Sequence, residues 1–418
     1  MAKRFSIIIP TRERHETLGA TIKTVINQDF DDFEIIIADN FSSFPTKKVV
    51  ETFISDKVRY FRTDSSLSMT DNWEFALSKS NGEYVIILGD DDGLIEGALT
   101  ALNSIIVKTS NKLIRWERAY YSWPNMEPTV FANKLHVKFD KANKIVDGHQ
   151  LINEVINFNA DYRLLPMLYN SAVHSSLIES TIKSTGRFFH STIPDVFSGF
   201  ALAYLAGEFV SIGIPMSINA GSAKSNGASF LYKSRSETIN NDFQKLNDES
   251  EIIFDMDIPF VRSFPIAIIE PYIKYLKVIR GSDSEYDYLK AYVLIIKSLI
   301  CYDKEELYLF AKIIKDKAVQ KNLDLDKIQS ELNSVMLSNI DEIVGPKTGF
   351  KSDEVVLDAA EFGLKDVFDV SVFVNKFYDF KSFEDENFKI QPDILSYKKM
   401  SLKMRIRKVV KIIFMGKV

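Results

Sequence analysis

Residues 84–93, with the sequence YVIILGDDDG, run from five hydrophobic residues directly into three consecutive aspartates. A segment that is hydrophobic at every position is typical of a central parallel strand, because helices cover both faces of such a sheet. Ligands of open α/β sheets bind at the carboxyl ends of the strands, so we expect the aspartates at a binding edge. Three adjacent carboxylates repel one another, and a hard divalent cation relieves that repulsion. A solvated acidic turn is the alternative interpretation.

The acidic segment ends a regular alternation of strands and helices. Hydrophobic segments at residues 5–10, 33–38 and 58–61 precede it, and residues with hydrophobic side chains at helical spacing lie between them. Units of roughly 25 residues that alternate in this way are typical of right-handed βαβ crossovers. We therefore expect an α/β fold with a mostly parallel sheet over residues 1–107.

The remainder of the chain has a different pattern. Residues 108–235 predict short strands and loops that are rich in aromatic residues, and the chain beyond them predicts helices. We therefore expect one domain over residues 1–235, followed by an α-helical C-terminal domain over residues 236–395 and a separate tail over residues 396–418.

The composition excludes several classes of protein. With 52 basic and 57 acidic residues, the net charge of −5 argues against a general nucleic-acid binder. The single cysteine, Cys301, excludes an intramolecular disulfide and fits a reducing compartment. The N-terminus has no apolar signal segment, and no window reaches the roughly 18 uninterrupted hydrophobic residues of a membrane-spanning helix. We therefore expect a cytoplasmic protein.

Polar side chains follow the first two predicted strands. Pro10 and Thr11 end the first strand, and Asp39 follows the second. Because the carboxyl ends of parallel strands meet at one edge of a sheet, we expect these residues beside the acidic triplet. Asp39 could accept hydrogen bonds from a base or a ribose, and a helix cap or Asx turn is its alternative role. Arg12 and Arg14 are candidates for a phosphate contact or for solvated positions.

Three segments, IIIPT at residues 7–11, EIIIADN at 34–40 and GEYVIILGDDD at 82–92, resemble the N-terminal half of family 2 glycosyltransferases with the GT-A fold. The resemblance covers residues 4–107 well and continues thinly to about residue 230. It implies a Rossmann-like nucleotide-sugar domain that transfers a sugar, with inversion, to a hydroxyl of a glycan or lipid-linked glycan. Similar bacterial members build capsule or O-antigen repeats at the inner face of the plasma membrane, and we expect a UDP-sugar as donor.

The resemblance also implies which residues hold the nucleotide. In the family, the end of the first strand and the aspartate after the second strand hold the base, which corresponds here to Pro10, Thr11 and Asp39. Arg12 would lie near the donor phosphates. Asn72 is a candidate for a further donor contact, although its spacing to the acidic strand is two residues longer than in common members.

The acidic triplet corresponds to the family's Asp-x-Asp motif, which holds Mn²⁺ or Mg²⁺ on the donor diphosphate. Gly89 stands in the first place of the usual motif in this chain. Asp91 therefore becomes the leading candidate for the direct metal ligand, with Asp90 or Asp92 supporting it.

The family's inverting members have a later aspartate that serves as general base, and Asp195, directly after Pro194, is the match. The chemistry requires such a group, because an acceptor hydroxyl must lose its proton as it attacks the anomeric carbon. A positioned carboxylate contributes roughly 10²- to 10⁴-fold to such a step. Without the resemblance, an N-terminal helix cap behind a proline is the simpler role for Asp195.

The tail at residues 396–418 carries eight Lys and Arg residues and no acidic residue. On a helical wheel its hydrophobic and basic side chains fall on opposite sides. The segment therefore predicts either a peripheral helix on an anionic membrane or a helix docked on its own domain with a solvated basic face.

Other functions fit the sequence less well or differ in class. A dinucleotide-dependent oxidoreductase needs glycines in the first turn, and residues 11–14 contain none. A non-catalytic glycan-binding or scaffold protein on a degenerate transferase domain is the main alternative to a hexosyltransferase. The helical domain is a candidate for self-association into a homo-oligomer, for membrane docking or for acceptor binding, and its hydrophobic stripes do not choose among these roles.

Overall fold

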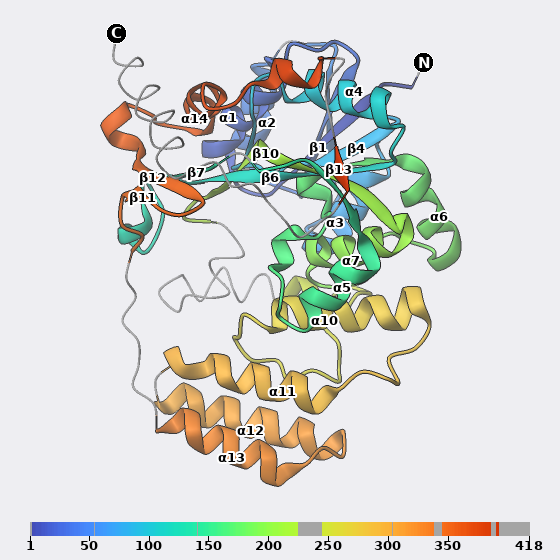
Figure 1. The fold of residues 1–418 in the computed structure, drawn as a ribbon, viewed down its shortest axis with the longest axis vertical. Coiled ribbons are helices and arrows are strands. Elements are labelled where there is room, and N and C mark those ends of the chain that lie inside the picture. Colours follow the sequence, from blue (N-terminus) through green and yellow to red (C-terminus); the bar gives the residue numbers. More distant parts are fainter. Residues whose placement is uncertain are drawn as a thin grey trace.

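The computed structural model describes residues 2–53, 55–139, 141–224, 245–302, 304–337, 345–385 and 390–392, without the side chains of residues 300, 301, 391 and 392. Figure 1 shows a sheet in the upper part of the molecule, with helices on both of its faces, and a group of helices below it. Within the described ranges, no helix is both long enough and hydrophobic enough to cross a membrane. The predicted tail at residues 396–418 lies outside them.

The predicted parallel strands form the centre of the sheet in the order β4-β1-β2-β3. They are β1 (Phe5–Thr11), β2 (Phe33–Asp39), β3 (Val58–Arg62) and β4 (Tyr84–Ile87). Every residue of β2 and β4 is buried, and all of them are hydrophobic except Glu34 and Asp39 of β2. Thr11 pairs with Asp39 in the register of β1 and β2, so the polar ends of the two strands reach the same edge.

Helices cover both faces of these strands and form two hydrophobic cores with them. The first core contains α1 (His15–Ile26), α2 (Phe44–Glu51) and α4 (Ala98–Thr109). The second contains α3 (Met69–Leu77), α5 (Gly148–Ile156), α6 (Ser175–Thr185) and α7 (Pro194–Ala206). Ile7 and Ile9 of β1 belong to the first core and Ile8 to the second, as the two-residue period of a strand requires.

The sheet continues beyond β4 through strands that the sequence predicted only in outline. They are β5 (Gly93–Leu94), β6 (Leu113–Ser122), β7 (Lys134–Lys138), β8 (Lys144–Asp147), β9 (Ser171–His174) and β10 (Glu208–Gly221). The short strand β9 lies antiparallel between β4 and β6, while β10 runs parallel to β6 and antiparallel to β5. The pairing with β5 brings the end of β10 beside the segment that follows the acidic triplet.

A third hydrophobic core belongs to the helical region at the bottom of Figure 1. Its helices are α10 (Ile266–Tyr275), α11 (Tyr288–Lys297), α12 (Lys304–Gln320) and α13 (Leu325–Met336). A π-helical segment, Leu276–Arg280, continues α10, which also packs on α7 of the sheet domain. The α/β fold followed by a helical region is therefore confirmed, while the predicted boundary at residue 235 lies outside the described residues.

The chain after α13 differs from the expected uninterrupted helical domain over residues 236–395. Two strands, β11 (Gly349–Phe350) and β12 (Glu354–Asp358), extend the sheet, with β12 antiparallel to β7. Helix α14 (Val367–Asn375) packs on α1, and β13 (Gln391–Pro392) pairs with β8. The reason is hydrophobic burial, since Val355, Leu357 and Val370 complete the first core of the sheet domain.

Candidate active site

Asp39 lies at the end of β2, beside Thr11 of β1, and its side chain is fully buried. Its Oδ1 accepts a hydrogen bond from the Ser42 backbone N–H at 2.9 Å, and its Oδ2 accepts one from the Tyr60 hydroxyl. Burial and the Asp39 carboxylate raise the pKa of the Tyr60 hydroxyl. The nearby Arg62 Nε is 3.9 Å from Asp39 Oδ2. These partners hold the loop after β2 against β3 and occupy both carboxylate oxygens of Asp39.

Arg14, from the loop after β1, lies between two aspartates of the triplet. Its Nη1 is 3.0 Å from Asp90 Oδ1 and 3.2 Å from Asp91 Oδ2, and its Nη2 donates to the carbonyl oxygen of Lys224. The sequence analysis left this side chain as a phosphate contact or a solvated arginine. In the structure it supplies a positive charge to a cluster of buried carboxylates.

The end of β10 and the residue after it, Ser222, lie against Asp91 and Asp92. Ser222 Oγ donates to Asp91 Oδ2 at 2.8 Å, and the Ala220 backbone N–H donates to Asp92 Oδ1 at 2.6 Å. The remaining oxygen of Asp92 accepts from the Gly89 N–H at 3.2 Å. A Cβ atom at Gly89 would lie 2.7 Å from Asp92 Oδ2. This close approach explains why a glycine stands where the usual motif has an aspartate.

The triplet carries more negative charge than the chain neutralises. Burial raises the pKa of Asp90 to about 6, partly offset by Arg14, and burial together with Asp91 raises the pKa of Asp92 to about 7. Such a site favours an additional cation. Among the described residues, no three acidic, histidine or cysteine side chains are placed to hold a metal ion by themselves. Asp91 and Asp92 nevertheless fit Mn²⁺ or Mg²⁺, because Mg²⁺ is usually bound by one or two carboxylates together with substrate phosphates and water.

Asp195 is the second residue of α7, after Pro194, while the N-cap position belongs to Ile193. Asp195 is therefore not the N-cap itself, but its carboxylate interacts with backbone N–H groups of the first turn, so a role at the helix end stays open. Burial raises the pKa of the Asp195 carboxyl group, and the N–H groups of the first turn, Arg118 and the Tyr169 hydroxyl partly offset this effect. A partly exposed carboxylate with a raised pKa is compatible with the predicted role of a general base.

The sequence analysis did not identify Arg118 of β6 or the tyrosines around it as site residues. The guanidinium of Arg118 lies over the ring of Tyr169 at 4.5 Å and near that of Tyr120 at 5.6 Å. Its charge lowers the pKa of both Asp92 and Asp195, which places it between the triplet and α7. β6 also carries Arg115 and Glu117, so a charged residue in this strand is no specific signal for the role of Arg118.

The structure places the other predicted donor residues near the same edge of the sheet. Pro10 is partly buried in β1, and the Arg12 backbone N–H lowers the pKa of the Asp90 carboxyl group. Asn72 lies on α3 with 4% of its surface exposed, and its Oδ1 has no hydrogen-bond partner. An orphaned buried oxygen at this position is compatible with a ligand contact.

Comparisons with known proteins match the N-terminal part of the chain to glycosyltransferases. Residues 6–135 match the family model described as glycosyl transferase family 2. A GalNAc(5)-diNAcBac-PP-undecaprenol beta-1,3-glucosyltransferase from Campylobacter jejuni is 39% identical over 102 residues, which are 24% of this chain and 33% of that protein. A UDP-Glc:alpha-D-GlcNAc-diphosphoundecaprenol beta-1,3-glucosyltransferase from Escherichia coli is 25% identical over 105 residues, which are 25% of this chain and 42% of that protein.

The matches to these curated relatives thus span less than half of their length. Among solved structures, S. aureus TarS 1-349 in complex with UDP-GlcNAc aligns with a TM-score of 0.46 and 14% identity. That alignment covers 79% of this chain and 91% of the TarS chain.

Proposed function

Because residues 6–135 match the family model described as glycosyl transferase family 2, we propose that this protein is a metal-dependent, inverting glycosyltransferase. The donor is a nucleotide sugar, and we propose a UDP-sugar. The acceptor is a hydroxyl of a glycan or lipid-linked glycan in the synthesis of a bacterial capsule or O-antigen. The names of the two curated relatives, each of which includes an undecaprenol-linked diphosphate, support this acceptor class.

The observation that carries the proposal is the joint placement of the acidic triplet and Asp195. Both lie within the electrostatic range of one buried side chain, Arg118, although they come from different parts of the chain. An inverting transfer needs a cation site for the leaving group on one side of the anomeric carbon and a base on the other. One site with both features supports transfer over simple binding.

In the proposed reaction, the acceptor hydroxyl oxygen forms a bond to the anomeric carbon of the donor sugar. The bond from that carbon to the diphosphate oxygen breaks, and the nucleoside diphosphate leaves with the bonding electrons. Asp195 accepts the proton of the hydroxyl, so atoms and charges balance. The metal held at Asp91 and Asp92 would supply positive charge for the diphosphate.

We assign the remaining predicted residues to the donor. Pro10, Thr11 and Asp39 would contact the base, and Arg12 and Asp90 would lie near the phosphates. Each oxygen of Asp39 has one partner and can accept a second hydrogen bond, so a base N–H could bind while Ser42 and Tyr60 stay in place. Asn72 would use its free Oδ1 for a donor hydroxyl.

The proposed location of the protein in the cell follows from the proposed acceptor. A lipid-linked glycan lies at a membrane, so we propose a cytoplasmic protein with peripheral contact to the inner face of the plasma membrane. The basic segment at residues 396–418 is the proposed point of contact, and a protein shortened after about residue 396 should bind anionic vesicles more weakly. Unchanged binding would leave the docked-helix interpretation of this segment.

A thermal-shift screen of nucleoside diphosphates and nucleotide sugars, with and without Mn²⁺, tests the donor site. Ligands that bind only the folded protein raise its melting temperature. We expect a metal-dependent shift for one nucleotide, its loss in Asp39→Ala, and release of nucleoside diphosphate from the matching sugar donor. No shift with any nucleotide would favour the non-catalytic scaffold instead.

A further inference from the structure

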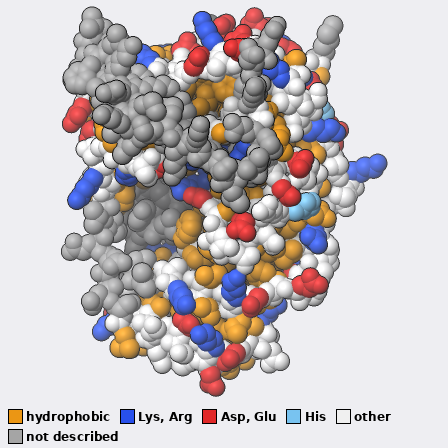
Figure 2. All heavy atoms as spheres, viewed as in Figure 1, with side chains coloured by type: hydrophobic (Ala, Val, Ile, Leu, Met, Phe, Trp, Pro, Cys, Tyr) orange, Lys and Arg blue, Asp and Glu red, His pale blue; other side chains and the backbone are white. Residues whose placement is uncertain are grey.

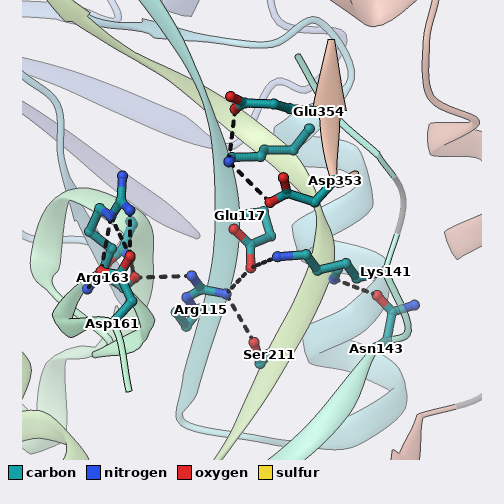
Figure 3. Close-up of polar contacts among 12 residues, drawn as sticks. Arg115, Glu117, Lys141, Asn143, Asp161, Arg163, Ser211, Asp353 and Glu354 are labelled. Carbon is teal, nitrogen blue, oxygen red and sulfur yellow. Dashed lines mark hydrogen bonds and ion pairs between the residues drawn. The ribbon is translucent and has the colours of Figure 1, made fainter. Parts of the chain in front are cut away.

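Arg115 and Arg118 of β6 are buried to the same extent, but they differ in the partners that the chain gives to their guanidinium groups. Figure 3 shows Arg115 with its partners: its Nη1 is 3.1 Å from Glu117 Oε1 and 3.2 Å from Ser211 Oγ, and its Nη2 donates to the Arg163 carbonyl oxygen at 3.0 Å. Lys141 completes this cluster at 3.5 Å from Glu117. The charge of Arg115 is therefore compensated within the chain.

Arg118, three residues later, has no such compensation. Its side chain is 3% exposed, yet its Nη1 has no hydrogen-bond partner, and no carboxylate of the described residues lies within ion-pair distance of it. The nearest groups are the rings of Tyr169 and Tyr120, and burial raises the pKa of the Tyr169 hydroxyl. Asp92 and Asp195 act on Arg118 only from beyond ion-pair distance. A buried guanidinium without a direct ion pair is unfavourable, so the site fits an anionic ligand group.

The position of Arg118 favours a group of the acceptor. Tyr169 lies against both Arg118 and Asp195, and Asp195 is the proposed base for the acceptor hydroxyl. Tyr120, Tyr162 and Tyr169 are each partly exposed and lie around Arg118. A ligand would reach Nη1 when one of these rings turns aside, a kind of side-chain change that is common on binding.

An exposed hydrophobic surface begins beside Tyr162. The ring of Phe264 packs edge to face on that of Tyr162, with centroids 5.6 Å apart, and Phe264 is 44% exposed. Ile253, Met256 and Phe260 of the same segment are also exposed. Figure 2 shows hydrophobic side chains gathered on this part of the face, around α10. An anion pocket that continues into an apolar surface fits a ligand with a charged head and a hydrocarbon chain.

We propose that Arg118 binds the diphosphate of a polyprenyl-diphosphate-linked sugar, with the polyprenyl chain along the surface that contains Phe260 and Phe264. This inference rests on the proposed function and sharpens it. The sugar that carries the attacking hydroxyl would be attached directly to the lipid diphosphate, so the acceptor comes from a reaction that leaves a sugar 1-phosphate on a polyprenyl phosphate.

Binding of geranyl diphosphate to the full chain tests this inference without any need for turnover. Calorimetric titrations would be made with UDP and Mn²⁺ present, so that the donor site is filled, and repeated without them. We expect the dissociation constant to rise at least tenfold in Arg118→Gln, and less in Arg118→Lys, which keeps the charge but not the fork-shaped donor geometry. Arg163→Gln is the matched control, because its guanidinium is already paired with Asp161.

The ligand series separates the head group from the chain. We expect inorganic pyrophosphate to bind more weakly than geranyl diphosphate, and geraniol not to bind measurably. Equal binding of geranyl diphosphate to wild type and to a folded Arg118→Gln protein, or equal binding of geraniol and the diphosphate, would overturn the proposal. If UDP abolished binding of geranyl diphosphate, Arg118 would serve the donor instead.

The same experiment keeps the two proposals apart. Arg118-dependent binding by a protein with no transferase activity would refute only the proposed function. Transfer from a nucleotide sugar, combined with binding that is independent of Arg118, would refute only this inference. The melting temperature of Arg118→Gln is the folding control, and we expect no decrease, since the variant removes an uncompensated buried charge.

Discussion

The acidic triplet and the Asp195 pocket contrast in how far the protein satisfies their polar groups. Asp91 and Asp92 accept hydrogen bonds from Ser222 and Ala220. In the Asp195 pocket, by contrast, Arg118 keeps a buried Nη1 without a partner. The difference suggests that the triplet is preorganised within the chain, whereas the second pocket is completed by its ligand.

The largest expected effect is at the base. Asp195→Asn keeps the shape of the side chain but cannot accept the proton, so we expect transfer to fall roughly 10²- to 10⁴-fold with unchanged nucleotide binding. In the wild type, burial raises the pKa of Asp195, so the rate should rise with pH through a value above the ordinary 3.8. Initial rates measure the loss in the variant, and a pH profile measures the dependence in the wild type. Asp161→Asn, which changes a nearby exposed carboxylate, is the control. A variant with the original rate would place the base elsewhere.

The triplet should give the next largest effect. Asp91→Asn removes one charge from the proposed metal site, and we expect a loss of about 10²- to 10³-fold, as removal of the metal with a chelator should give. Rates as a function of Mn²⁺ concentration measure the change. Asp64→Asn, at an exposed position near the same edge, is the control. If Asp91→Asn kept full metal-dependent turnover, the assignment of Asp91 as a metal ligand would be wrong.

The next prediction concerns stability instead of activity, and its smaller effect depends on Glu270 of α10. Its Oε2 accepts from Ser191 Oγ, its Oε1 accepts from the Asp255 N–H, and burial raises its pKa from 4.5 to about 7. A raised carboxyl pKa means that the folded state retains a proton that the unfolded chain releases. Stability should therefore fall as the pH rises from about 4.5 to about 7, and remain constant above that.

Glu270→Gln should remove this dependence. We expect the variant to match the wild type at about pH 4.5 and to exceed it at pH 8 by up to about 3 kcal/mol in free energy of unfolding, at about 1.4 kcal/mol per pKa unit. Urea denaturation at the two pH values measures the difference. A variant that is less stable than the wild type at pH 8 would show that the carboxylate is satisfied by its partners there.

The smallest effect tests the packing of the triplet. In Gly89→Ala, the added Cβ would lie 2.7 Å from Asp92 Oδ2, so the loop must shift, and we expect a loss of about 1 to 3 kcal/mol. Gly19→Ala is the control, because its Cβ would meet Val49 at an ordinary 3.4 Å. Thermal denaturation compares the two variants, and equal melting temperatures would show that the triplet is less tightly packed than described.

The sequence predicts the first half of the fold well because each signal there is local. β1, β2 and β4 are mostly hydrophobic, with Ser6 and Glu34 as interruptions; Asp39 ends β2, and the triplet follows β4 after Leu88 and Gly89. Once the strands are parallel, their polar ends must share an edge. The roles of these residues, including that of Asp195, came from the family resemblance and stay predictions.

The second pocket could not be predicted in this way because its residues come together only through tertiary packing. Arg118 lies on β6, Tyr162 and Tyr169 lie in short helical turns before and after residues 165–167, and Asp195 begins α7. No spacing in the sequence links them. The return of β12 to the sheet was missed for a similar reason, since its five residues resemble many short hydrophobic segments.

The pairing of β12 with β7 also sets the order in which the protein can fold during synthesis. His136 of β7 and Glu354 of β12 interact across the two strands, yet they are 218 residues apart in the chain. At roughly 5 to 20 residues per second, a ribosome needs about 10 to 40 s to make the intervening chain. The edge of β7 therefore stays unpaired while α10 to α13 emerge, and an unpaired strand edge can pair with another chain. Lys134 and Lys138 at the two ends of β7 oppose such pairing during this interval.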